Sequence, residues 1–312
     1  MSDTQDWERQ LLEKLASASL VEQRRSRQWK IFFRLAWLAV IGLIAASIFM
    51  RDEEKSAGSL AGGGHTAVIE LDGAITSENE TGKKMISALD HAFRDKNTKG
   101  VIIDANSPGG SPVLSGMVYD EIRLLKKKHA DIPVYVVVSE VCASGCYYIA
   151  AAADKIFVDK ASIVGSIGVL SDGFGFTGAM EKLGIDRRLK TAGENKAMGD
   201  PFSPPNPKHD AIRQQLLDDI HRQFIQAVQA GRGQRLKNDP QMFSGMVWLG
   251  EKAIPLGLAD GYGTVASVAR DVVKAEKTVD FTQQDDFSSR VARRIGVEFA
   301  GGVKSLFDTK LF

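Results

Sequence analysis

Cysteine is scarce in this sequence, which has two among its 312 residues, Cys142 and Cys146. Two cysteines are too few for a disulfide framework, and the five histidines are scattered away from them, so we expect no metal site. A basic surplus is also missing, because 40 Lys and Arg against 39 Asp and Glu leave a formal net charge of +1. This balance argues against a nucleic-acid-binding protein. Without internal repeats or low-complexity tracts, the composition indicates an ordinary globular chain.

One long apolar run stands near the beginning of the chain. Residues 35–50 carry no charge, and the apolar residues just before them extend the run to about 20 residues, which is enough to span a bilayer. Arg34 lies inside the extension, but an arginine near a helix end can reach the headgroups. We therefore expect a transmembrane helix at residues 29–50. A cleaved signal peptide is the alternative, and the long segment before the run argues against it.

The charges beside this run predict its orientation. Residues 51–55 carry both signs, whereas only basic residues stand close before the apolar run, at Arg24, Arg25, Arg27, Lys30 and Arg34. The positive-inside rule then puts residues 1–28 in the cytoplasm as a short tail, and the chain after residue 50 outside it. The Gly-rich end of residues 51–65 is typical of a flexible linker.

From residue 66 onward, short apolar runs alternate with helical patterns. The expected strands lie at 67–71, 100–104, 133–138, 155–158 and 163–170, and the expected helices at 79–96, 111–129, 144–153, 206–232, 250–256 and 262–275. This alternation predicts an α/β fold with a mostly parallel sheet. Ligands of open α/β sheets bind beyond the carboxyl ends of the strands. We therefore expect the small-residue turns at 106–110 and 143–145 to face one site.

Ser144 is a candidate nucleophile. It follows an expected strand and opens an apolar helix, which is the setting of a nucleophile elbow, although the local sequence Cys-Ala-Ser-Gly-Cys is not G-x-S-x-G. A serine at a helix start can instead be a simple N-cap. The loop 106–110 also precedes a helix, and its two glycines would let backbone N–H groups face a substrate. A plain turn is the alternative interpretation of that loop.

The residue that would activate such a serine is less clear from the pattern. No histidine has a distinctive setting, so a Ser-His-Asp triad is weakly supported. A lysine can act as the base where burial keeps it neutral near the working pH. Lys196 lies in a small-residue loop after an expected strand. Spacing alone does not distinguish it from Lys182 or Lys190.

Several motifs in order make the chain resemble the signal peptide peptidase A family of bacterial Ser–Lys proteases, in its short, single-repeat form. The resemblance covers about residues 66–275, the expected protease domain, and the anchor before it. The wider fold group includes the Clp proteolytic subunit and the enoyl-CoA hydratases (crotonases), which implies a repeated β-β-α core. The motifs are Val68–Ile75, Asn106–Ser111, Ala143–Tyr148, Gly165–Val169, Gly193–Lys196 with Asp200–Phe202, and Val247–Trp248 with Gly257–Asp260.

The resemblance implies a role for each matching residue. Ser144 would be the nucleophile, Lys196 the general base, and Ser166 the residue that orients the lysine. The oxyanion hole would be formed by backbone N–H groups of glycines, those of Gly145 and of either Gly109 or Gly110. Such chemistry requires no metal and no cofactor.

The resemblance also implies partners and a location. Short members of the family assemble as homo-oligomers, with octamers expected, and the Ser and Lys of one site can come from neighbouring subunits. The substrates would be membrane-associated peptides such as signal-peptide remnants, or misfolded membrane and exported proteins. The protein would be single-pass in the bacterial inner membrane, with its protease domain outside the cytoplasm.

The extension 276–312, amphipathic at 286–307, would pack as a helix or contact the membrane or another subunit.

Cys146 departs from the family pattern, which commonly has glycine there. A bond to Cys142 would need the two Cα atoms within about 7 Å and would strain the elbow, so we expect two buried thiols. Two other functions compete with a protease. A hydratase-like acyl-CoA enzyme would favour a soluble protein with acidic catalytic residues, and a non-catalytic, membrane-tethered scaffold would have no use for Ser144, Lys196 and Ser166.

Overall fold

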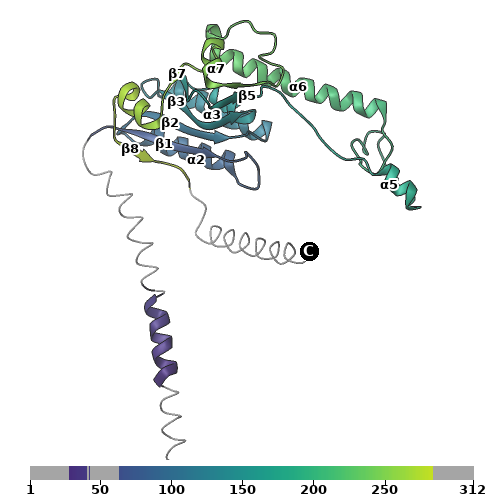
Figure 1. Ribbon diagram of the computed structural model, residues 1–312, viewed down its shortest axis with the longest axis horizontal. Helices are drawn as coiled ribbons and strands as arrows, with labels where there is room; N and C mark the ends of the chain where they lie inside the picture. Colours follow the sequence, from purple (N-terminus) through teal and green to yellow (C-terminus); the bar gives the residue numbers. More distant parts are fainter. Residues whose placement is uncertain (1–27, 41, 43–62, 284–312) are drawn as a thin grey trace, which may run out of the picture. The chain divides into compact units, whose positions relative to one another are not determined.

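The computed structural model describes residues 28–40, 42 and 63–283, and the chain divides into two units, Met1–Gly62 and Gly63–Phe312. In the first unit, residues 28–40 and 42 are helical (Figure 1), with the rings of Trp29, Phe32 and Phe33 in mutual contact. None of the helices within the described ranges is both long and apolar enough to cross a membrane. The expected anchor at 29–50 lies partly outside the described residues.

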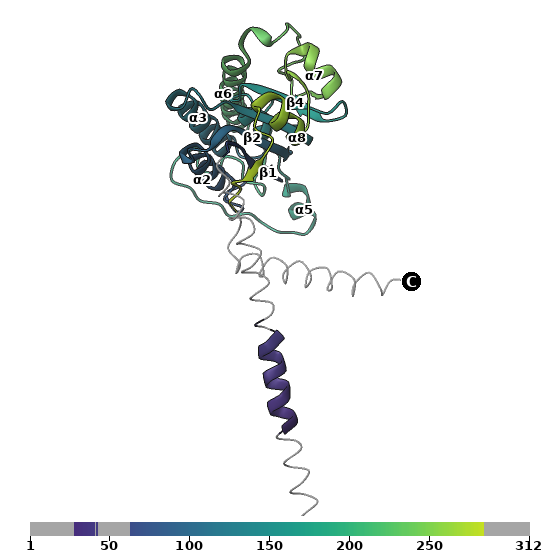
Figure 2. The same ribbon diagram turned by 90° about the vertical axis from the view of Figure 1, so that its left-hand side faces the viewer.

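A mostly parallel sheet forms the centre of the second unit (Figures 1 and 2), which confirms the predicted α/β class. Its order is β6-β5-β3-β2-β1-β8, with β4 paired to β3 and β7, and the single antiparallel pairing among these strands joins β5 to β6. The strands are β1 (His65–Asp72), β2 (Thr98–Ser107), β3 (Val134–Ala143), β4 (Lys155–Val158), β5 (Ile163–Gly165), β6 (Val247–Leu249), β7 (Gly261–Tyr262) and β8 (Thr278–Asp280). β8 falls within the expected extension 276–312, yet it pairs with β1.

Single helices connect successive strands in the first half of this unit. The helices are α2 (Thr81–Arg94), α3 (Pro112–Lys128), α4 (Gly145–Ala150), α5 (Thr177–Lys182), α6 (Pro207–Arg232), α7 (Gly250–Leu256) and α8 (Val265–Ser267), with a 3-10 turn at Gly233–Arg235 and a π-helix at Val268–Val273. α3 begins at a proline, which suits a first helical position, and the Ser111 side chain accepts a hydrogen bond from the Leu114 N–H. The expected segment 286–307 lies outside the described residues.

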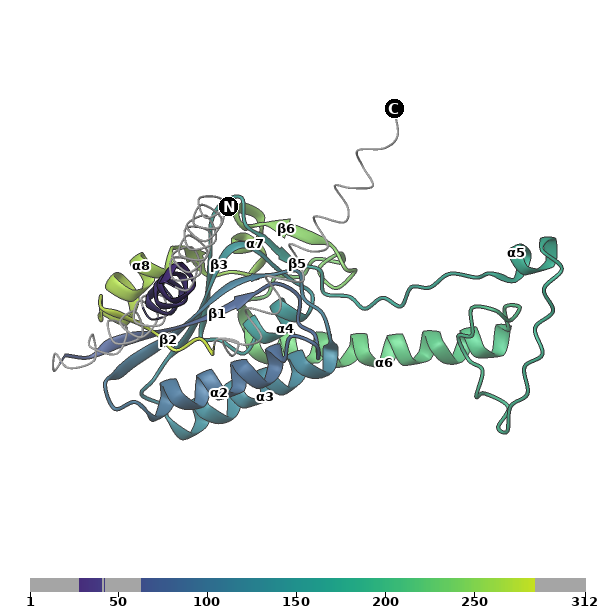
Figure 3. The same ribbon diagram turned by 90° about the horizontal axis from the view of Figure 1, so that it is seen from below.

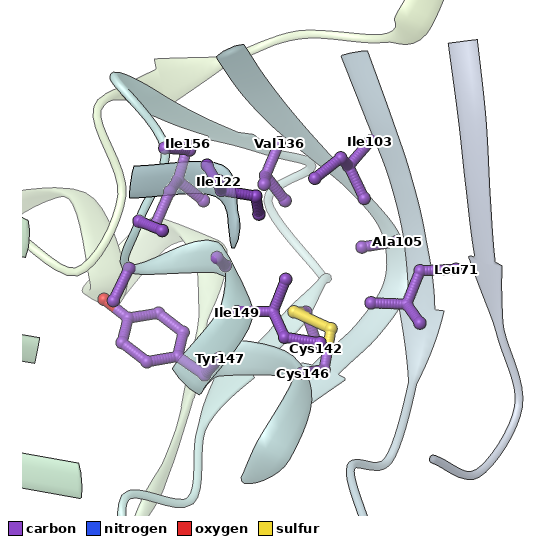
Figure 4. Packing of buried hydrophobic residues seen from close by; sticks show 14 of the residues in the cluster. Leu71, Ile103, Ala105, Ile122, Val136, Cys142, Cys146, Tyr147, Ile149 and Ile156 are labelled. Atoms are coloured by element: carbon purple, nitrogen blue, oxygen red, sulfur yellow. A yellow bond between two sulfur atoms is a disulfide. The ribbon is translucent and has the colours of Figure 1, made fainter. Parts of the chain in front are cut away.

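Both faces of the sheet are covered, as parallel sheets require. Adjacent residues of β2 point to opposite faces: Ile103 joins the main core and Ile102 a smaller cluster on the other face. Figure 4 shows the main core, where Val136 of β3 and Ile156 of β4 pack with Ile122 of α3. Because neighbouring strands are fixed by this packing, the turns that follow β2 and β3 are held side by side.

One segment of the second unit has no such core. Residues 171–206, here called the arm, run away from the sheet and include α5, and they return to the far end of α6 (Figure 3). All of the arm is described, and not one of its residues is buried. Large apolar side chains on it are open to solvent, among them Phe174 (81% exposed), Leu183 (73%) and Ile185 (55%).

Candidate active site

The turn between β3 and α4 holds Ser144 in an unusual backbone conformation. Its φ is 52° and its ψ −121°, a region that costs a non-glycine residue about 1–3 kcal/mol and is associated with functional sites. The Ser144 N–H donates to the Gly165 carbonyl (2.8 Å), and the Ser144 carbonyl accepts from the Tyr148 N–H (3.0 Å). The side chain does not cap α4. Ser144 does stand at the N-cap position of α4, but its hydroxyl makes no capping hydrogen bond and is left for other chemistry.

The glycine loop after β2 lies directly against this turn. A Cβ atom added to Gly109, whose φ is 98°, would stand 2.6 Å from the Gly145 nitrogen and 2.7 Å from the Ser144 Cβ. A Cβ added to Gly145 would stand 3.2 Å from the Gly110 nitrogen. Glycine is thus required at position 109 for the two backbones to meet, whereas a side chain at position 145 would need the Gly110 backbone to shift by a few tenths of an ångström.

The N–H groups of these glycines differ in their availability. That of Gly109 donates to the Ser107 hydroxyl at 3.1 Å. Those of Gly110 and Gly145 have no acceptor among the residues that the structure describes. The sequence left open whether Gly109 or Gly110 acts with Gly145. The free N–H groups favour Gly110 with Gly145 as the pair that can stabilise an oxyanion.

Ser166 reaches the same place from β5. Its φ is 51°, and its N–H donates to the Met246 carbonyl at 2.7 Å. The described residues include four non-glycine residues with positive φ, and two of them, Ser144 and Ser166, line one cavity of about 580 Å³. Predicted site residues on its lining are Ser144, Ser166, Gly109, Gly110 and Gly145.

An apolar wall completes this cavity, and sequence reasoning missed it. Tyr148 of α4 stacks on Phe224 of α6, with ring centroids 4.9 Å apart, and Ile220, Val169 and Leu170 extend the wall. The apolar spacing of 220 and 224 along the expected helix at 206–232 was a signal, but it fits an ordinary core face equally well. Burial raises the pKa of the Tyr148 hydroxyl, which keeps this wall uncharged.

Lys196 is not brought to Ser144 within one chain. It lies on the arm with an exposed side chain, as do Lys182 and Lys190, and none of the three lines the cavity in the described structure. His221 of α6 contacts the Ile167 carbonyl oxygen at 3.0 Å and does not line the cavity either. Among the described residues, no lysine, histidine or carboxylate lines the cavity beside Ser144.

The two cysteines form a disulfide, so our expectation of two buried thiols was wrong. The Cα atoms of Cys142 and Cys146 are 5.1 Å apart, inside the usual range for a disulfide, because the chain reverses at Ser144 between them. Both residues are fully buried in the main core (Figure 4), on either side of the turn at Ser144, which is called the elbow below.

Known proteins resemble the chain over most of the second unit. The model of peptidase family S49 matches residues 126–280. A protein of Methanocaldococcus jannaschii, named as a candidate protease, is 32% identical over 246 residues, which cover 75% of this chain and 78% of that protein. Protease 4 of Haemophilus influenzae is 33% identical over 221 residues, 70% of this chain and 35% of that protein.

A further match has a name of another kind. The Na(+)/H(+) antiporter NhaA of Brucella melitensis is 42% identical over 209 residues, 65% of this chain. The match covers 28% of that relative's length. The name describes the whole relative, so it does not transfer to the matched part.

Proposed function

This chain belongs to peptidase family S49, a family of serine proteases, and we propose that it cleaves peptides with a Ser–Lys dyad of Ser144 and Lys196. One observation carries the proposal. Ser144 is held at positive φ, with its hydroxyl not used as a cap, in a cavity that Gly110 and Gly145 also line, and the N–H groups of these two glycines have no acceptor among the described residues. A serine protease needs this combination of a presented hydroxyl and two free donors.

The chemistry follows from these groups. Neutral Lys196 takes the proton of the Ser144 hydroxyl as the oxygen attacks the peptide carbonyl, and the N–H groups of Gly110 and Gly145 stabilise the resulting oxyanion. The protonated lysine then gives its proton to the leaving amine, which releases an acyl-enzyme. Lys196 next removes a proton from water, and the resulting attack frees Ser144. Ser166 would accept a hydrogen bond from the lysine and fix its position.

Lys196 must reach a cavity that its own chain does not bring it to. We propose that the arm of one copy supplies Lys196 to the Ser144 of a neighbouring copy in a homo-oligomer, with eight subunits expected. The apolar side chains of the arm support this, since Phe174, Leu183 and Ile185 have no cover in the single chain. The edge strand β6 also has Val247 and Leu249 about half exposed (49% and 52%), which offers an apolar surface for a partner.

The substrate and location are further parts of the proposal. The wall of Tyr148, Phe224 and Ile220 favours small or aliphatic side chains beside the cut, as in remnants of signal peptides or exported proteins. An anchor at 29–50 would keep the site near the membrane, with the catalytic unit outside the cytoplasm, on a core of the Clp-protease/crotonase type. A disulfide between Cys142 and Cys146 supports an oxidising compartment.

Peptide hydrolysis by mixed variants tests the dyad and its division between subunits. We expect Ser144→Ala and Lys196→Ala each to fall to background, and their mixture, after subunit exchange, to regain part of the activity. Lys190→Ala, also on the arm, is the matched control and should keep its activity. Full activity of Lys196→Ala would refute Lys196 as the general base. If the mixture stays inactive although subunit exchange is demonstrated, the site is not shared between subunits.

A further inference from the structure

The disulfide encloses the proposed nucleophile. Cys142 is near the end of β3, Cys146 is near the beginning of α4, and Ser144 stands midway between them. The bond therefore closes a small ring of backbone whose middle residue has the strained conformation. Nothing in the catalytic steps uses either sulfur, so the bond needs a different explanation.

The two ends of the ring are held very differently. Cys142 pairs with Ser107 of β2 and with Val164 of β5, so its position is fixed from both sides by the sheet. Cys146 belongs to α4, which has six residues, far fewer than the roughly 12–15 that a helix needs for stability of its own. The disulfide thus fastens a short helix to a rigid strand.

Other contacts hold α4 at a distance from the nucleophile. The Tyr147 hydroxyl donates to the Leu258 carbonyl at 2.7 Å, and Tyr148 stacks on Phe224. These contacts fix the side of α4 that faces α6 and the chain after α7. Near Ser144, α4 also packs against α3, and the glycine loop after β2 lies against Gly145. The disulfide adds a covalent cross-link between β3 and α4 across Ser144 to these contacts and to the two backbone hydrogen bonds of Ser144.

We propose that the Cys142–Cys146 bond is a positioning element that keeps Ser144 in its strained conformation, so that proteolysis is faster with the oxidised pair than with two free thiols. This inference rests on the proposed function of Ser144. Without the bond, the elbow can relax toward ordinary φ values, which moves the hydroxyl and the Gly145 N–H away from Gly110. Binding of the substrate's side chain against the apolar wall does not depend on that geometry. Loss of the bond should therefore lower the rate of the chemical step more than the affinity for substrate.

The redox step is ordinary thiol–disulfide exchange with a dithiol reductant. One reductant thiolate attacks a sulfur of the pair, and a mixed disulfide forms while the other cysteine leaves as a thiolate and takes up a proton. The second reductant thiol then displaces the remaining cysteine, so the pair gains two electrons and two protons and the reductant becomes a disulfide. Because both cysteines are fully buried, exchange requires the elbow to open and should be slow.

The experiment compares kcat and KM of the full-length protein in three forms. These are the oxidised protein, the protein reduced with dithiothreitol until alkylation and mass measurement show two free thiols, and the Cys142→Ala/Cys146→Ala variant. We expect kcat to fall about tenfold in the last two forms, with KM nearly unchanged. Without the bond, a relaxed elbow must regain the strained conformation of Ser144 before the reaction can occur. Dithiothreitol should leave the double variant unaffected, and reoxidation should restore the reduced protein.

A destabilised control separates positioning from general loosening. Val136→Ala removes a buried side chain of β3 away from the elbow, so it should lower the melting temperature while leaving kcat intact. An unchanged kcat in both the reduced protein and the double variant, in an enzyme that Ser144→Ala inactivates, would overturn the positioning role alone. Activity that survives in Ser144→Ala would instead overturn the proposed function.

Discussion

The elbow and the arm carry the two halves of the proposed dyad, and they are built in opposite ways. Ser144 stands on a turn between a central strand and a buried helix. Its backbone N–H and carbonyl are both hydrogen-bonded, and a disulfide joins the residues two positions before and after it. Lys196 stands on a segment with no buried residue. One half of the proposed dyad is therefore preorganised by its own chain, whereas the other half lies on a segment that its own chain does not bury.

Two glycines with the same backbone angle offer the sharpest test of that difference. Gly109 in the glycine loop after β2 and Gly193 on the arm both have φ of 98°. An added Cβ at Gly109 would stand 2.6 Å from the Gly145 nitrogen, whereas at Gly193 it would meet nothing within 4 Å. Gly109→Ala should abolish hydrolysis and lower the free energy of unfolding by several kcal/mol, and Gly193→Ala should lower it by about 1 kcal/mol.

Thermal or denaturant unfolding of both variants, with an activity assay, measures this pair. Equal destabilisation by the two substitutions would mean that backbone strain alone matters and that the close approach of the two turns is unimportant. That result would contradict the contact on which the oxyanion assignment depends.

A charge placed on the arm should separate assembly from stability. Leu183 is 73% exposed, so Leu183→Asp removes little buried apolar surface from the single chain. It should change the free energy of unfolding of the single chain by less than about 0.5 kcal/mol. If the arm packs on a neighbour, the aspartate is buried there, and both oligomeric size and hydrolysis should fall strongly. Leu124→Asp on α3, at a position 44% exposed, is the matched control.

Size-exclusion chromatography with light scattering and the peptide assay report this outcome. An oligomer that tolerates Leu183→Asp while remaining active would show that the arm does not supply the lysine to a neighbour. Loss of assembly in Leu124→Asp as well would show instead that the contact surface extends beyond the arm.

The wall of the cavity should set the size of the accepted side chain. Phe224 is buried and stacks on Tyr148, so Phe224→Leu would open space beside Ser144. We expect a moderate loss of stability, about 1–2 kcal/mol, and a rise of several-fold in kcat/KM for peptides with a large apolar residue at the cut relative to those with alanine. An unchanged preference would mean that the residue at the cut binds elsewhere.

The sequence was most informative about the half that is built locally. The strand, turn and helix around Ser144 are contiguous in the chain, and the glycines of 106–110 reach the same edge because parallel strands end together. The arm could not be placed, because no local pattern shows which copy of the chain covers an exposed segment. β8 escaped prediction for a related reason, since a strand of three residues is recognisable only by its pairing with β1.

The disulfide was missed because of one backbone angle. Its cysteines are four positions apart in the sequence, and the distance between them depends on whether the chain reverses at Ser144. A positive φ at a serine has no signature in the sequence, so the closeness of Cys142 and Cys146 could not be derived. Neither the disulfide nor its proposed role could therefore be predicted without knowing the backbone conformation of Ser144.

The smallest expected effect lies at the beginning of the sheet, away from both halves of the dyad. Burial lowers the pKa of His65, although nearby Asp95 opposes the shift. The folded protein therefore prefers the neutral ring, and the unfolded chain takes up a proton first as the pH falls below about 6.5. Stability should decline from that pH down to the lower pKa of the folded state, and melting temperatures at about pH 7.5 and about pH 5.5 measure the decline. His65→Gln should reduce this pH dependence while leaving hydrolysis at neutral pH unchanged; an undiminished decline would assign it to carboxylates elsewhere.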